Sequence, residues 1–76
     1  MKHARSDYDR IQDPVGLIPP DEPVFLLRAQ DQHAAATVRY YASLVYEAKG
    51  DPEIISLSER QADLMDAWPT HKAPDI

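Results

Sequence analysis

Apolar residues recur with helical spacing in the second half of the chain. The first set lies within residues 32–49, and its members are four and three residues apart in turn: Ala34, Val38, Tyr41, Val45 and Ala48. This spacing places them on one side of an α-helix. It predicts an amphipathic helix over about residues 32–49, with Tyr41 at the centre of the apolar stripe and Asp31 as its N-cap.

A second apolar set predicts another helix over about residues 52–68. Its members are Ile54, Leu57, Leu64, Met65 and Trp68, with Gln61 near the middle. Three acidic residues, Glu59, Asp63 and Asp66, fall on the opposite side, which we expect to face solvent. Pro69 ends the helix because the residue before a proline disfavours helical backbone. We expect Met65 and Trp68 to pack in the core.

The two predicted helices are joined by Gly50-Asp51-Pro52. Glycine is common just past a helix end, where it adopts a positive φ at little cost. Aspartate is a good N-cap, and proline suits the first position of a helix. Because so short a connection leaves no room for another arrangement, we expect an antiparallel helical hairpin.

The first 23 residues differ from the rest because they carry four prolines and few large apolar side chains. Proline excludes a long helix here and favours extended or turn backbone. Residues 1–23 are therefore predicted to form an extended Pro-rich arm, and residues 24–76 a helical-hairpin domain with a short C-terminal tail. The arm is either flexible or ordered with Leu17 and Ile18 laid over the helices or a neighbouring subunit. The predicted fold class is mainly α.

An uninterrupted apolar run follows the arm: Val24, Phe25, Leu26 and Leu27. A run of this length is typical of a short buried strand, although a turn of helix fits the same pattern. We found no second strand candidate in the chain with which it could pair. Since an unpaired strand edge promotes association, these four residues are predicted to form an oligomer interface with the same segment of another copy.

Length and composition support self-association and exclude several classes of protein. The chain has 76 residues, no cysteine and a net charge of −5. A domain of this size has a marginal core, and a partner chain is the remaining way to enlarge it. We therefore expect a homo-oligomer, with a dimer favoured. The negative charge argues against a general nucleic-acid binder, and no apolar run approaches the ~18 residues that span a membrane. With no secretory signal, a cytoplasmic location is expected.

Arg28, Gln30 and Asp31 form the candidate binding site, where the apolar run meets the first helix. Arginine, amide groups and free helix N–H groups suit a carboxylate or a phosphate. The alternative is a structural Arg28–Asp31 bridge with an N-cap. Arg39 and Tyr46, on the polar side of the first helix, are further binding candidates, because an exposed tyrosine suits an interface or a stacking site.

Catalytic and metal-binding patterns are missing from the sequence. There is no HExxH, Gly-rich phosphate loop or G-x-S-x-G motif, and the three histidines lie far apart. The acidic residues of the second helix are expected to be a solvated face and not an acid–base pair. We therefore predict a non-enzymatic protein with no metal and no cofactor.

The stretch DEPVFLLRAQDQHAAATVRYYA and the later DLMDAW with a Pro-Asp tail resemble a group of short bacterial and phage-encoded proteins. The shared features are the EPVFLLRAQD core, a V-R-x-x-A helix and an M-x-A-W ending, over about residues 21–75. The resemblance implies a phage or prophage context and carries no catalytic role. The predicted function is a small binding protein that acts on a host or phage macromolecule, as an inhibitor, an anti-defence protein or an accessory factor. The alternative is an oligomeric small-ligand binder, such as a nucleotide-sequestering protein.

Overall fold

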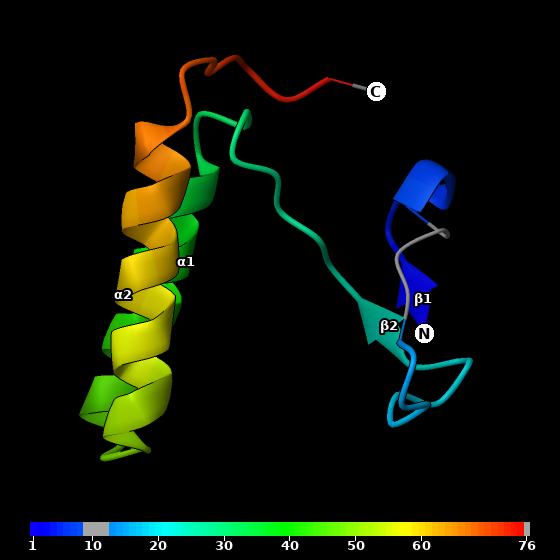
Figure 1. Ribbon diagram of the computed structural model, residues 1–76. Coiled ribbons are helices and arrows are strands. Elements are labelled where there is room, and N and C mark those ends of the chain that lie inside the picture. The colour runs from blue at the N-terminus through cyan, green and yellow to red at the C-terminus, as the bar shows by residue number, and fades with distance from the viewer. Residues whose placement is uncertain (9–12, 76) are drawn as a thin grey trace.

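The chain is mainly helical, as the apolar spacing predicted. A computed structural model describes residues 1–8 and 13–75, and its main elements are α1 (Ala34–Glu47) and α2 (Pro52–Ala67). The two helices lie side by side and run in opposite directions (Figure 1). Each helix lies within the range expected from the sequence. The predicted helical hairpin is confirmed.

Small residues form the contact between the helices. The buried apolar residues of the described chain are Ala34, Ala35, Ala42, Ala62 and Met65. No large side chain is fully buried among the residues described. Alanine brings the two backbones close together, because little side-chain volume separates them.

The buried side of α2 is turned by about one residue from the predicted stripe, and on α1 the shift affects the middle of the stripe, while Ala34 and Val38 of the predicted stripe do face the core. Tyr41, the predicted centre of the first stripe, is 52% exposed, whereas the next residue, Ala42, is 1% exposed. On α2, Leu64 is 65% exposed and Met65 is 8% exposed. The prediction for Met65 is confirmed. That for Trp68, which is 54% exposed, is wrong within this chain, because the helices meet through small residues and leave the bulky ones outside.

The connection between the helices has a cap that differs from the predicted one. The residue with positive φ is Lys49, at 57°, and Gly50 follows it. The Gly50 amide donates to the Val45 carbonyl at 2.8 Å, which closes a Schellman-type C-cap. Gly50 is required for another reason: a Cβ there would lie 2.6 Å from Val45 Cγ1. Asp51 is the N-cap of α2, as predicted, and accepts from the Glu53 amide at 2.9 Å.

The start of α1 also differs in detail from the prediction. His33, not Asp31, occupies the N-cap position and makes no capping bond with its side chain. Asp31, three residues before the start of α1, instead accepts a hydrogen bond from the His33 amide at 2.8 Å. The Asp31 carboxylate therefore stabilises the turn that leads into α1.

The arm begins and ends in a small sheet. Strand β1 (Lys2–His3) pairs in parallel with β2 (Pro23–Val24), and a short 3-10 helix, η1 (Ser6–Tyr8), follows β1 (Figure 1). The expectation that the apolar run has no strand partner within the chain is wrong. A two-residue parallel pairing needs only backbone groups, so the polar pair Lys2–His3 gave no sequence signal. Residues 9–12 of the arm lie outside the described residues.

The rest of the apolar run leaves the sheet and crosses to the hairpin. Leu27 and Ala29 pack against the core cluster of the helices, together with Val38. Phe25 points outward and is 73% exposed, and Leu17 of the arm is also exposed. Leu17 therefore does not cover the helices. The interface predicted for Val24–Leu27 stays a prediction, but its original reason, an unpaired strand, no longer applies.

The C-terminal tail returns to the segment that precedes α1. The Gln32 amide donates to the Lys72 carbonyl at 2.9 Å, and the Lys72 amide donates to the Gln30 carbonyl at 2.8 Å. These two bonds join Asp31 and Lys72 in a short parallel bridge. Neither helix, within residues 1–8 and 13–75, is long and apolar enough to cross a membrane.

Candidate binding pocket

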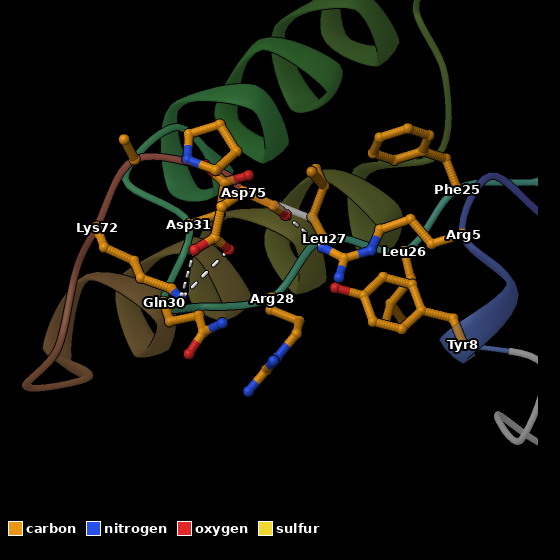
Figure 2. Close-up of a pocket in the computed structure, with 12 residues that line it drawn as sticks. Arg5, Tyr8, Phe25, Leu26, Leu27, Arg28, Gln30, Asp31, Lys72 and Asp75 are labelled. Atoms are coloured by element: carbon orange, nitrogen blue, oxygen red, sulfur yellow. Dashed lines mark hydrogen bonds and ion pairs between the residues drawn. The ribbon is translucent and has the colours of Figure 1, made fainter.

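Three segments that are distant in the sequence meet around one cavity of about 300 Å³. They are the start of the arm, the segment before α1, and the C-terminal tail (Figure 2). The lining residues are Arg5, Tyr8, Phe25, Leu26, Leu27, Arg28, Gln30, Asp31, Lys72, Ala73, Pro74 and Asp75. This volume is at the lower end of the range for small-ligand sites. The lining combines apolar side chains with charged groups, which suits a ligand that has both an apolar and a charged part.

The arm is held against the tail by Arg5. Its Nη1 donates to the Asp75 carbonyl at 2.9 Å, while its Nη2 pairs with the Asp7 carboxylate at 3.0 Å. The guanidinium also lies over the ring of Tyr8, 4.9 Å from its centre. The hydrogen bonds that Arg5 donates to the Asp7 carboxylate are the main reason that the pKa of Arg5 is raised. Arg5 is thus occupied in closing the pocket.

The tail contributes an ion pair of its own. Lys72 Nζ lies 3.2 Å from Asp75 Oδ2. Because Asp31 bonds to the His33 amide, its carboxylate too has a partner. The expected alternative of an Arg28–Asp31 bridge is not among the ion pairs of the described residues.

Arg28 and Gln30 are polar lining groups on the segment before α1. Both side chains project to the same side of the segment, away from the ion pair between Lys72 and Asp75 (Figure 2). Arg28 is exposed and forms no ion pair with any residue that the structure describes. A guanidinium offers a planar fork of donors that matches a carboxylate or a phosphate. Phe25, which also lines the pocket but projects to the other side of the segment (Figure 2), adds an exposed aromatic surface.

The five predicted binding residues separate into two groups. Arg28, Gln30 and Asp31 all line this pocket. Arg39 lies on the hairpin, where its Nη2 pairs with Asp63 at 2.9 Å and with Asp66 at 2.7 Å.

Tyr46 is the fifth predicted residue and lies away from the other four. It is exposed beside the junction of the two helices, where it lines a shallow hollow with Gly50 and Pro52. Of the five predicted residues, Arg28, Gln30 and Asp31 therefore share one pocket, while Arg39 and Tyr46 lie elsewhere on the hairpin.

Four charged or aromatic residues of the pocket had no role in the predicted site: Arg5, Tyr8, Lys72 and Asp75. Arg5 and Asp75 are 70 residues apart, and no periodicity links the ends of the chain. The only available signal was Tyr8, an aromatic residue in a polar arm. Contacts of this kind depend on the tertiary fold and have no local pattern.

The side chains that line the pocket determine which chemical groups it can contact. No cluster of three or more acidic or histidine side chains that could hold a metal ion occurs in the part of the chain that the structure describes. The pocket contains no serine, threonine, cysteine or histidine side chain. Its available donors, Arg28 and Gln30, can bind and orient an anionic group.

Comparison with known proteins gives no relative. No family model, curated protein or solved structure matches the chain. The case for function therefore depends on the pocket and on the surface of the hairpin.

Proposed function

We propose that the protein is a non-enzymatic binding protein that holds an acidic segment of a protein partner in this pocket. One observation carries the proposal: the Arg28 guanidinium, which forms no ion pair with any residue that the structure describes, lines the same pocket as Gln30 and the exposed ring of Phe25. Because Arg28 and Phe25 project from opposite sides of the segment (Figure 2), a stretch of several residues with a carboxylate and an apolar side chain would be needed to contact both.

The charge of the chain favours a protein over a nucleic acid as the partner. A net charge of −5 repels a long polyanion, whereas one carboxylate needs only the local field of Arg28. The partner belongs, on this proposal, to a host or to a phage, and the protein acts in the cytoplasm as an inhibitor, an anti-defence protein or an accessory factor. That setting follows from the sequence resemblance.

Site-specific photo-crosslinking tests the proposal. We expect a photoreactive phenylalanine analogue at position 25 to give a discrete protein adduct in bacterial cells, and Arg28→Glu to abolish it. The same analogue at position 17 is the control, since Leu17 is equally exposed but lies outside the pocket. Identical adducts from both positions, or an adduct that Arg28→Glu leaves unchanged, would contradict the proposal.

A small-ligand binder is the second candidate, and the cavity volume of about 300 Å³ favours it. Arg28 would contact a phosphate, and Tyr8 or Phe25 would contact a base. A panel of nucleotides in a thermal-shift assay separates the two. A rise of several degrees with one nucleotide, lost in Arg28→Glu and without a protein adduct at position 25, would favour this function.

A further inference from the structure

One face of the hairpin presents large apolar side chains to solvent. They are Tyr41, Leu44, Ile54, Leu57, Leu64 and Trp68, here called the apolar face. Their exposed fractions run from 41 to 65%. Single exposed apolar residues are ordinary, but a contiguous group of six on two adjacent helices is typical of an interaction site.

Helix geometry places five of the six residues on the same side of the pair, and Trp68 follows Leu64 by four residues at the C-cap of α2. Tyr41 and Leu44 each precede a position that faces α2, and Ile54, Leu57 and Leu64 each precede one that faces α1. In an antiparallel pair, the residue that precedes a contact position points to the same side of the contact on both helices.

The opposite face provides an independent check on this placement. Asp63 and Asp66 each follow a position that faces α1, namely Ala62 and Met65. Both carboxylates pair with Arg39 of α1, so these residues share one side of the hairpin. The apolar face therefore lies on the side away from the ion pairs.

We infer that the apolar face is covered by the apolar face of a second copy of the chain. The proposal rests first on the stripe along α2, which contains Ile54, Leu57, Gln61, Leu64 and Trp68. The spacing is 3-4-3-4, as in coiled coils and helical bundles, and it is nearly symmetric about Gln61. Two α2 helices laid antiparallel across a two-fold axis at Gln61 match this stripe with itself.

The match extends to the individual side chains. In this register Ile54 lies opposite Trp68 of the second copy, and Leu57 lies opposite Leu64. Gln61 meets its own symmetry mate, and a carboxamide can pair with itself because it has both donors and an acceptor. The only polar residue of the stripe thus lies where the symmetry supplies its partner.

The exposed area is sufficient for a stable pair. Large side chains present about 150–250 Å² each when exposed, so the six residues leave on the order of 600 Å² uncovered. A two-fold pair would bury about twice that area, at the lower edge of standard interfaces. Such a pair would also supply the large buried side chains that the alanine-based core of one hairpin does not contain.

Charge favours a second copy over a lipid surface as the occupant. The six residues and Gln61 carry no charge, although 28% of the chain is charged. Peripheral helices bind anionic lipid with a basic polar face, whereas this hairpin carries Glu59, Asp63 and Asp66 on its other face. A neutral, self-complementary stripe is suited to another copy of the same hairpin.

Solution mass and thiol cross-linking test the inference on the full chain. We expect light scattering to give twice the chain mass of 8.6 kDa over micromolar to millimolar concentrations. The chain has no cysteine, so Gln61→Cys introduces a single thiol. A short bismaleimide should link this variant into covalent dimers in high yield. Ser56→Cys, exposed on another side of α2, should give at least tenfold less.

Each measurement can overturn the proposal. A mass of 8.6 kDa at every concentration excludes a second copy on the apolar face. Equal cross-linking yields from Gln61→Cys and Ser56→Cys exclude the α2 seam even if the protein is a dimer. Leu64→Asp should convert the dimer to a monomer, and the cross-linking comparison still decides the question if that variant fails to fold. None of these results depends on the ligand of the pocket.

Discussion

The two faces of the helical hairpin are built on the same two helices and differ in how far each satisfies itself. On the polar face, Arg39 bridges Asp63 and Asp66 of the other helix at 2.9 and 2.7 Å. On the apolar face, large side chains such as Leu64 and Trp68 meet solvent within the chain. Alanine contacts between the helices explain both the ion pairs and the exposed apolar side chains. They bring the helices close enough for charged side chains to reach across, and they leave too little space between the helices to bury large side chains. The charged groups of the polar face thus find partners within the hairpin, whereas the large side chains of the apolar face do not.

A charge on the apolar face should have the largest effect. Leu57→Asp places a carboxylate in the proposed dimer seam, so we expect a loss of about 3 kcal/mol or more. For a domain of this size that corresponds to a fall in melting temperature of more than about 10 °C, measured by circular dichroism. Ser56→Asp is the matched control: it adds the same charge to an exposed neighbouring position and should change stability by no more than about 0.5 kcal/mol.

Equal melting temperatures for Leu57→Asp and Ser56→Asp would contradict the prediction that the apolar face is buried and the polar face is not. The comparison must be made at one protein concentration, because the stability of a dimer rises with concentration. A wild-type melting temperature that is independent of concentration would count against the seam as well.

Enlarging the seam between the helices should have the next largest effect. Ala62 is fully buried, and Ala62→Leu forces extra volume between α1 and α2. Overpacking of this kind costs about 1–3 kcal/mol. Ala67→Leu, on the exposed side of the same helix, is the control and should be close to neutral. Chemical denaturation of both variants measures the difference, and equal midpoints would show that the alanine contact is not tight.

Substitutions in the connection between the helices should have smaller effects on stability, and the effects at Lys49 and Gly50 should have opposite signs. Gly50→Ala puts a Cβ 2.6 Å from Val45 Cγ1 and is expected to cost about 1 kcal/mol or more. Lys49→Gly relieves a positive φ of 57° and should stabilise the chain by up to about 1 kcal/mol. Thermal melts of both variants check the signs. A stabilising Gly50→Ala would show that the close approach is absent.

Removing the ion pairs of the polar face should have the smallest effect. The hydrogen bonds that Arg39 donates to Asp63, and then to Asp66, raise the pKa of Arg39. The guanidinium therefore stays charged at neutral and mildly alkaline pH, and its contribution declines only as the pH rises through this raised pKa. All three side chains are exposed, so Arg39→Gln should lower the melting temperature by a few degrees at most. The difference in melting temperature between the wild type and Arg39→Gln should shrink at high salt. A large decrease in melting temperature that does not depend on salt would contradict this prediction.

The helices were predictable from the sequence because their signals are local. The Gly50-Asp51-Pro52 junction and the two apolar spacings placed both helices within a few residues of their observed bounds. The side that each helix buries was not predictable in the same way. The prediction followed the largest side chains, whereas Ala42 and Ala62 determine the contact.

The candidate site was predictable only in part. Arg28, Gln30 and Asp31 were recognised from the junction of the apolar run with the helix, and all three line the pocket. The other walls come from both ends of the chain, where Arg5 meets Asp75. Periodicity and capping rules act over a few residues, so they carry no information about a contact that spans 70 positions.

The separation of 70 residues between Arg5 and Asp75 also has a consequence for the order of events in folding. The hairpin is joined by bonds between neighbours, such as that from Gly50 to Val45, and can form in microseconds. The pocket requires closure of nearly the whole chain, which costs more entropy and comes later. By microscopic reversibility, the contact that forms last opens first. A ligand that binds between the arm and the tail therefore selects the closed chain and slows its opening, while the hairpin remains folded throughout.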